Sequence, residues 1–287
     1  AGFENLGSTE HVPQAFVINK KKKILGLLFH PEIEHTEYGT DILEQFISMT
    51  GIKKSKHKID IDKIIQKIKA QVGDAYVIGA VSGGVDSTVA SALVARAIGK
   101  NFTGFYVDNG LMRIGTTEHV RSIYSHLDVD FDIINGEKEM LKRLKGITDS
   151  EQKRKIIGNY YIEVFEAEMR RLRKEGKKVK FLMQGTIYSD VIESKGSKHA
   201  DKIKSHHNVG GLPEKMKLEL LEPLRDFYKD EVREIGTSLG LPKEFVWKQV
   251  FPGPGYGVRI RGEVTAKRLA QAKQADQIIL EELEKAD

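Results

Sequence analysis

The sequence predicts an α/β protein with a doubly wound, mainly parallel sheet and a short separate segment in front of it. Three observations predict this fold. Between residues 61 and 250, short apolar runs typical of buried strands alternate with longer amphipathic helical patterns. A glycine-rich turn at 82–84 joins the first of these strands to a helix. A polar, basic stretch at 51–60 separates this region from the preceding residues, as linkers do.

Residues 1–50 are predicted to form a β-hairpin followed by a short helix. The apolar runs Phe16–Ile18 and Ile24–Phe29 flank a lysine-rich turn at Asn19–Lys23. Two such runs joined by a short polar segment are typical of a hairpin with a solvated tip. The helix is expected over Asp41–Ile47.

The alternating region supplies the sheet and its helices. The predicted strands are Tyr76–Val81, Phe102–Val107, Phe131–Ile134 and Val179–Met183. The predicted helices include Ile61–Ala70, Thr88–Ile98, Glu118–Leu127 and Lys153–Lys174. Because parallel strands need right-handed crossovers, this alternation favours a parallel sheet covered by helices on both faces.

Residues 251–287 form the last segment, predicted as a hinge and the start of a further, C-terminal domain. Phe251-Pro-Gly-Pro-Gly-Tyr-Gly257 indicates a rigid hinge, and 263–287 is predicted as a helix. Val264, Leu269, Ile279 and Leu283 are expected to form the apolar face of that helix. Since the helix ends without a glycine cap or stop signal, we expect the natural protein to extend beyond both ends.

Composition indicates a soluble cytoplasmic protein. No apolar run approaches the roughly 18 residues of a membrane span, and the first residues show no signal pattern. The 46 basic and 41 acidic side chains are compatible with nucleic acid but equally with small anionic substrates. Because bases and acids interleave on helices, as in Glu166–Lys178, we expect no nucleic-acid partner. The absence of cysteine excludes disulfides and a thiol nucleophile within these residues.

A phosphate-binding loop is predicted between the first core strand and its helix. Its residues are Ser82, Gly83, Gly84, Val85, Asp86, Ser87 and Thr88. The two glycines permit positive φ and expose backbone amides, and the helix directs its positive end at an anion. The three hydroxyls are further donors, and Asp86 can hold Mg²⁺ or cap the helix. Because the lysine of a Walker loop is missing, the loop is better suited to a departing β,γ-pyrophosphate.

Ser-Gly-Gly-Val-Asp-Ser at 82–87 resembles the signature of the PP-loop, or N-type ATP pyrophosphatase, superfamily. Its members include GMP, NAD, asparagine and argininosuccinate synthetases and several tRNA-modifying ligases. The resemblance implies an adenine nucleotide α-hydrolase-like fold and ATP as substrate. It also implies that the adenosine lies at Val107–Gly110, where backbone groups of Val107 read the adenine edge.

Five further segments resemble the GMP synthetase family in the correct order. They are Lys153–Gly158, Gln184–Ser194, Lys204–Pro213, Phe251–Gly255 and Gly257–Val264. The resemblance implies that the O2 oxygen of XMP attacks the α-phosphorus of ATP, after which ammonia displaces AMP to give GMP. The family uses glutamine as the source of ammonia, and its C-terminal domain pairs subunits, so a homodimer is expected.

The downstream segments also contain side chains suited to this chemistry. Asp190 and Glu193 are three residues apart, so a helix starting near Tyr188 would place both carboxylates on one face, where they suit Mg²⁺. A helix cap or a surface acidic pair is the alternative. Lys204, His206 and His207 lie in a polar, glycine-rich stretch predicted to be a lid that stabilises charge on the reacting phosphates. Solvated histidines, or a metal site, are the alternatives.

Arg154 lies in the basic entry to a long predicted helix. A guanidinium there can bind a nucleotide phosphate through a bidentate fork, which gives it a substrate-binding role. An ordinary surface arginine is the alternative.

Gly26–Glu32 resembles the last catalytic strand of a class I glutamine amidotransferase. The resemblance implies that His30 activates a cysteine nucleophile and that Glu32 orients His30. Because the sequence contains no cysteine, glutamine hydrolysis cannot occur on these residues alone. Residues 1–50 are therefore interpreted as the C-terminal remnant of that domain.

Three other hypotheses remain. A different PP-loop ligase, above all NAD synthetase, should lack the Lys204–Asn208 and Phe251–Gly255 segments. A tRNA-modifying protein should bind tRNA in a salt-sensitive way. An inactive scaffold is disfavoured by the intact loop, carboxylate pair and lid.

Overall fold

The computed structural model describes residues 2–33, 35–53, 58–196, 218–247 and 251–286. The chain divides into two compact units, Ala1–Lys58 and Ile59–Asp287. Each unit is described by itself. Of the helices in the described ranges, none has the length and apolar character needed to cross a membrane.

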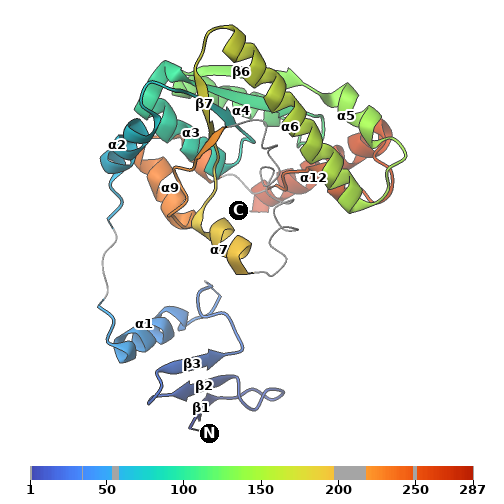
Figure 1. The fold of residues 1–287 in the computed structure, drawn as a ribbon. Helices are drawn as coiled ribbons and strands as arrows, with labels where there is room; N and C mark the ends of the chain where they lie inside the picture. Colours follow the sequence, from blue (N-terminus) through green and yellow to red (C-terminus); the bar gives the residue numbers. More distant parts are fainter. Residues whose placement is uncertain (1, 34, 54–57, 197–217, 248–250, 287) are drawn as a thin grey trace. The chain divides into compact units, whose positions relative to one another are not determined.

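The first unit is a small antiparallel sheet followed by a helix (Figure 1). Strands β1 (Glu4–Gly7), β2 (Phe16–Asn19) and β3 (Ile24–Leu27) pair in that order, and α1 spans Gly39–Thr50. The predicted hairpin is present as β2 and β3. The prediction missed β1, whose four residues include only one large apolar side chain.

The second unit contains a five-stranded parallel sheet in the order β6-β5-β4-β7-β8. The strands are β4 (Tyr76–Ala80), β5 (Phe102–Asp108), β6 (Asp130–Asn135), β7 (Val179–Met183) and β8 (Glu219–Leu221). The chain runs from β4 outward to β6 and then returns to the other side of β4. The central strand is therefore the switch point of the sheet, where α/β proteins bind ligands at the carboxyl edge.

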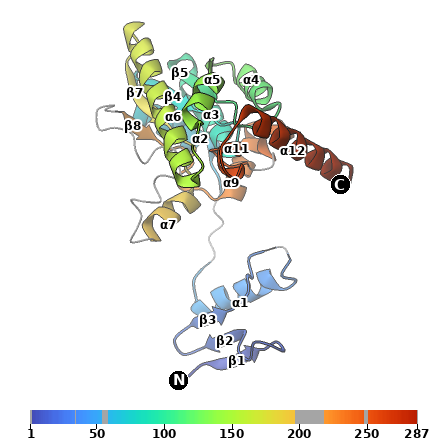
Figure 2. The same cartoon turned by 90° about the vertical axis from the view of Figure 1, so that its right-hand side faces the viewer.

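Helices cover both faces of this sheet (Figures 1 and 2). One face packs on α2 (Ile61–Val72), α3 (Val85–Ile98), α4 (Thr116–Leu127), α9 (Lys229–Ser238) and α10 (Lys243–Val246). The other packs on the long helix α6 (Ser150–Lys174). Side chains of β4 alternate between these layers: Val77 joins the first, and Tyr76 and Ile78 join the second.

A third apolar cluster lies beyond the carboxyl end of β5. It joins Val107 and α6 to α5 (Glu137–Leu144), α11 (Tyr256–Arg259) and α12 (Ala266–Ala286). The remaining described elements are the 3₁₀ turn Gly99–Asn101 and α7 (Tyr188–Gly196). Residues 251–272 thus contribute side chains to the core of the second unit.

The predicted strands of the sheet are present to within one residue at each end. The four helices predicted between 61 and 174 are present and are two or three residues longer than predicted, Asp41–Ile47 is extended to Gly39–Thr50, and the helix predicted over 263–287 spans Ala266–Ala286. One detail was wrong, namely the apolar face assigned to the last helix. Leu269 is buried, but Ile279 and Leu283 are 59% and 52% exposed. Only the first part of α12 packs on the core, and its C-terminal part extends past α11 (Figure 2).

Candidate nucleotide site

The predicted phosphate loop lies where β4 ends and α3 begins. Gly83 has a φ of +74°, and a Cβ there would come within 2.7 Å of Cγ2 of Val120 on α4. The turn therefore requires glycine for its dihedral angle and for its packing. Gly84 is the N-cap of α3 and makes no side-chain capping bond, so no capping side chain competes with an anion for the first amides of the helix.

The hydroxyl groups of the loop bond within the loop itself. Ser87 Oγ and Thr88 Oγ1 both donate to the carbonyl oxygen of Gly84, at 3.0 and 2.9 Å. The amide of Gly84 donates to Ser82 Oγ at 3.3 Å. Ser87 and Thr88 are buried, whereas Ser82 is exposed. We therefore expect Ser82 and the glycine amides to meet a phosphate, while Ser87 and Thr88 hold the shape of the turn.

Asp86, in the first turn of α3, forms an ion pair with Lys229 on α9. Lys229 Nζ lies 2.7 Å from each carboxylate oxygen of Asp86. Partial burial raises the pKa of Asp86, and the ammonium of Lys229 opposes this rise. The sequence analysis did not identify Lys229, because nothing local distinguishes it from the other bases among 46 lysines and arginines. Only the fold shows it opposite the loop.

The segment that follows β7 lies directly against the loop. A Cβ on Gly185 would come within 2.8 Å of the backbone nitrogen of Ser87, so the two backbones touch. Asp190, five residues further and in the first turn of α7, accepts a hydrogen bond from the amide of Ile187 at 2.9 Å and so caps the start of that helix. Its negative charge also contributes to the raised pKa of Asp86. The structure thus brings Asp86, Asp190 and Lys229 together.

The end of β5 provides an open backbone edge beside the loop. The last pair between β4 and β5 is Ala80 with Phe105, whereas β5 continues to pair with β6 as far as Asp108. On the β4 side, Val107 therefore lies beyond the last strand pair, although the residue is 2% exposed and its carbonyl accepts a hydrogen bond from the amide of Asn109 at 3.0 Å. A cavity of about 280 Å³ opens beside this end, and Asp108, Glu137 and Lys273 of α12 contribute to its lining.

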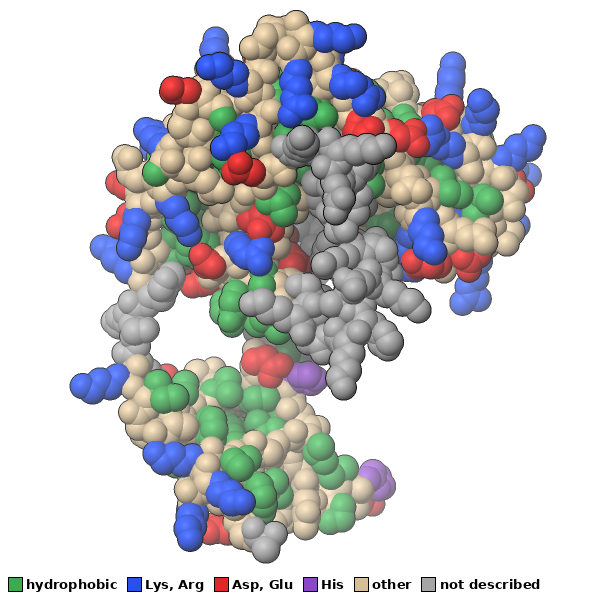
Figure 3. Space-filling view, viewed as in Figure 1, with side chains coloured by type: hydrophobic (Ala, Val, Ile, Leu, Met, Phe, Trp, Pro, Cys, Tyr) green, Lys and Arg blue, Asp and Glu red, His purple; other side chains and the backbone are tan. Residues whose placement is uncertain are grey.

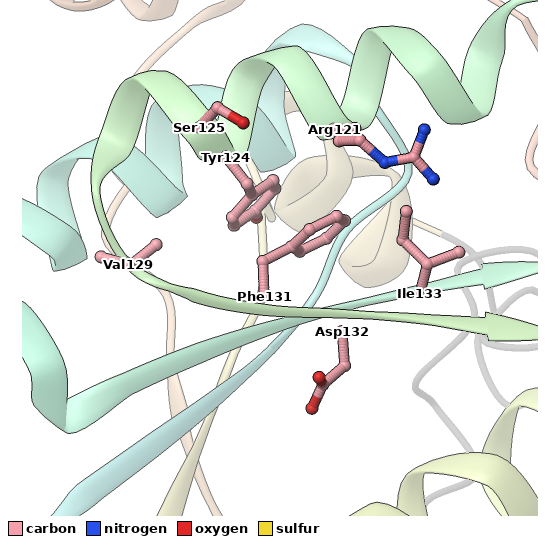
Figure 4. A pocket seen from close by; sticks show the side chains of 7 residues that line it. All are labelled: Arg121, Tyr124, Ser125, Val129, Phe131, Asp132 and Ile133. Carbon is pink, nitrogen blue, oxygen red and sulfur yellow. The ribbon is translucent and has the colours of Figure 1, made fainter.

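A larger cavity, of about 380 Å³, lies elsewhere, between α4 and β6 (Figure 4). The stacked rings of Tyr124 and Phe131, whose centroids are 4.2 Å apart, form part of its wall together with Arg121. The predicted site residues do not line it. We therefore place the candidate nucleotide site at the phosphate loop and not at the cavity between α4 and β6.

Arg154 lies near the start of α6, where it forms an ion pair with Glu151 at 3.3 Å and is about one-third exposed. The side chain thus remains available to a ligand at that end of the helix. Its neighbour Lys153 differs, being buried at 1% exposure with Nζ donating to the carbonyl of Ile260 at 2.7 Å. Burial lowers the pKa of Lys153, and the charge of Arg268 adds to this effect.

In the first unit, His30 and Glu32 contact each other as predicted for an oriented base. His30 Nδ1 lies 2.7 Å from Glu32 Oε1, and both side chains are exposed. A backbone hydrogen bond lowers the pKa of Glu32, with a further contribution from His30. The pair belongs to a different unit from the phosphate loop.

Several predicted residues lie outside the described part of the chain. These are Lys204, His206, His207 and the side chain of Glu193. In the described ranges, no group of three or more histidines, aspartates or glutamates is arranged to hold a metal ion. Asp86 and Asp190 supply carboxylate oxygens, the ligand type that Mg²⁺ prefers, and the charge of Asp190 acts on Asp86, so a magnesium site there stays a prediction.

Comparison with known proteins adds sequence relatives and one fold neighbour. No protein-family model matches the chain. It is 48% identical over 288 residues to the glutamine-hydrolysing GMP synthase of Aquifex aeolicus, covering 99% of this chain and 55% of that protein. It is 47% identical over 292 residues to that of Kluyveromyces lactis, covering 100% and 56%. The chain therefore spans about half the length of the curated relatives it matches.

Among solved structures, the NMN synthetase of Francisella tularensis matches with a TM-score of 0.52 and 14% identity. The match covers 70% of this chain and 79% of that one. Together with the parallel sheet, this likeness confirms the predicted fold class. At such low identity it carries no information about the substrate.

Proposed function

We propose, from the premise that this chain belongs to the glutamine-hydrolysing GMP synthase family, that its second unit carries the ATP-dependent step of GMP synthesis. In this reaction the O2 oxygen of XMP attacks the α-phosphorus of ATP and pyrophosphate leaves. Ammonia then attacks C2 of the adenylated purine and displaces AMP, giving GMP. The whole reaction is a carbon–nitrogen ligation that consumes one ATP.

The observation that carries this proposal is the position of the loop relative to the end of β5. Gly83 and Gly84 lie between the end of β4 and the start of α3. Val107 lies near the end of the neighbouring strand β5, beyond the last residue pair with β4. A nucleotide bound across these two points has its pyrophosphate at the loop and its base at β5. Its α-phosphorus then lies between them, accessible to an acceptor.

Lys229 supplies a mobile positive charge for the leaving group. Its ammonium is paired with the carboxylate of Asp86. Mg²⁺, when bound by Asp86 and Asp190, would neutralise the triphosphate. Lys229 is positioned beside the loop to donate to the departing pyrophosphate, whose charge grows as the bond to the α-phosphorus breaks.

Substrate and partner assignments follow from the family. Arg154 is proposed to bind the phosphate of XMP, and the lid residues Lys204, His206 and His207 to cover the reacting centre. His30 and Glu32 belong to the part that releases ammonia from glutamine. We also propose that the protein is a cytoplasmic homodimer.

No nucleic-acid partner is proposed. Lys and Arg side chains are interspersed with Asp and Glu on the surface of the second unit in the view of Figure 3. Arg171, for example, forms ion pairs with three acidic side chains, those of Asp132, Glu168 and Glu175. Such a surface lacks the single-sign stripe that tracks a phosphate backbone.

The test is pyrophosphate release from Mg-ATP in the presence of ammonium and one of two acceptors, XMP or nicotinic acid adenine dinucleotide. Release that requires XMP is the expected result. Release that requires the dinucleotide would keep the ATP chemistry and replace the substrate, as the NAD synthetase alternative predicts. No release with either acceptor from the full-length protein would contradict the proposal.

A further inference from the structure

The loop that follows β5 is fastened to the C-terminal helix by an ion pair. Arg113 Nε lies 2.6 Å from Asp276 Oδ2, and Arg113 Nη2 lies 3.4 Å from Oδ1, so the two planar groups meet side by side. The side chains are only 13% and 16% exposed, which limits solvent screening. The pair joins segments that are 163 residues apart in the sequence.

The hinge segment completes this pair. Tyr256 Oη donates to Asp276 Oδ2 at 3.0 Å, and Arg259 lies 3.5 Å from the same carboxylate. The guanidinium groups of Arg113 and Arg259 lie 4.5 and 4.6 Å from the ring centroid of Phe251. Burial alone would raise the pKa of Asp276, but hydrogen bonds from Arg113 and Tyr256 hold it below its ordinary value.

A second contact holds the same loop closer to β5. The amide of Tyr256 donates to the carbonyl of Leu111 at 2.8 Å, and a Cβ on Gly255 would collide with that carbonyl. The amide of Leu111 donates to Asn109 Oδ1 at 2.9 Å, and the amide of Asn109 donates to the carbonyl of Val107 at 3.0 Å. A run of hydrogen bonds thus connects the hinge to Val107.

We propose that Arg113 and Asp276 are positioning residues for the nucleotide site. Their ion pair fixes the loop 109–113 against α12 and thereby holds the backbone of Val107 where it meets the adenine base. Arg113 and Lys273, the latter on the same helix as Asp276, both contribute to the lining of the cavity beside the end of β5, so the ion pair and α12 lie at that end. The proposal rests on the proposed function, because it takes the end of β5 to be the adenine site.

The test compares equilibrium binding of ATP with binding of inorganic pyrophosphate in the full chain. Arg113→Gln is expected to weaken ATP binding about tenfold, the size of a typical coupling between residues in contact. Binding of pyrophosphate is expected to stay unchanged, because the phosphate loop is anchored by α3 and not by α12. Asp276→Asn should give the same result. The double variant should be no worse than either single one.

Arg143→Gln is the matched control. Arg143 forms a bidentate pair with Glu163 at 2.9 and 2.7 Å, and its guanidinium lies 4.8 Å from the ring centroid of Tyr160. Its loss removes the same kinds of contact as the loss of Arg113, but its acidic partners, Glu139 and Glu163, lie on α5 and α6 and not on α12. The control is expected to bind both ligands as the wild type does. Arg113→Lys, which keeps the charge but not the fork, should bind ATP with intermediate affinity.

Three outcomes would overturn the proposal. One is ATP binding by Arg113→Gln within twofold of the wild type, which would leave the proposed function intact. Another is an equal loss of ATP and pyrophosphate binding, which would indicate general loosening. If the wild type bound pyrophosphate but no ATP, the proposed function would fall as well. Should Arg113→Gln not fold, the nearly isosteric Asp276→Asn provides the same comparison.

Discussion

At the scale of single residues, Asp86 occupies a position that favours function over stability. It is partly buried in the first turn of α3, and burial raises its pKa even though Lys229 is bonded to it. A carboxyl whose pKa is raised on folding destabilises the folded state once it is ionised.

We therefore predict that Asp86→Asn lowers XMP-dependent pyrophosphate release by at least about a hundredfold, because it removes a charge needed by the triphosphate site. At pH 7 the melting temperature of the variant should not fall. The destabilisation of the folded state by ionised Asp86 is absent below the unfolded-state pKa of about 3.9. It grows as pH rises through the raised pKa of the folded state. The difference in melting temperature between variant and wild type should thus shrink on acidification. A variant less stable than the wild type at pH 7 would contradict this account.

Lys229 is the second residue-scale case, and we propose that it assists the leaving group. Lys229→Ala is expected to reduce the rate of pyrophosphate release about a hundredfold, as loss of one preorganised donor does. Lys229→Arg should recover part of that rate, since it restores the charge with a different shape. Steady-state kinetics with XMP and ammonium measure both. Lys180→Ala, which removes the exposed pair with Glu219, is the control and should have no effect.

At the scale of elements, the sequence predicted the helices and strands that have a clear apolar pattern. The strand Val179–Met183 was predicted with its observed bounds, because four of its five side chains are buried. β8 was missed because it has three residues, two of them exposed. α9 was missed as well, since it follows a segment without a clear period, and with it the position of Lys229. The phosphate loop was predictable because its chemistry is local. The Asp86–Lys229 pair was not, because its partners are 143 residues apart.

The contact between the segment after β7 and the start of α3 can be tested with glycines. Gly185→Ala should lower the free energy of unfolding by about 1–3 kcal/mol, because backbone atoms of Asp86 and Ser87 block its methyl group. Gly158→Ala, in α6, meets nothing within 4 Å and should raise that free energy by about 0.5–1 kcal/mol. Denaturant unfolding followed by circular dichroism measures both changes. If Gly185→Ala and Gly158→Ala changed the free energy of unfolding equally, the segment after β7 would accommodate the added methyl group without loss of stability.

At the scale of the whole molecule, the chain consists of two units with separate packing. The second unit contains three apolar clusters, all built from residues after 58. A core of this extent supports independent folding. Its nucleotide site likewise draws its described residues from this unit alone.

Removal of residues 1–58 is therefore predicted to leave XMP-dependent pyrophosphate release with ammonium within about twofold of the full chain, as expected for an independently folded domain. Heat-induced unfolding of the shortened protein should remain one cooperative transition. Pyrophosphate release by the shortened protein and by the full chain is measured in the same assay, with ammonium as the nitrogen donor. Loss of both activity and cooperativity would show that the first unit is required for folding of the second.

The burial of Lys153 has a consequence for chemical labelling. Its amine is enclosed between α6 and the segment that ends at Ile260, whereas Lys155, two residues further, is exposed. An amine-reactive reagent should modify Lys155 at once and reach Lys153 only when that segment lifts away from α6. The ratio of the two labels, read peptide by peptide in a mass spectrometer, then reports how often the C-terminal segment opens.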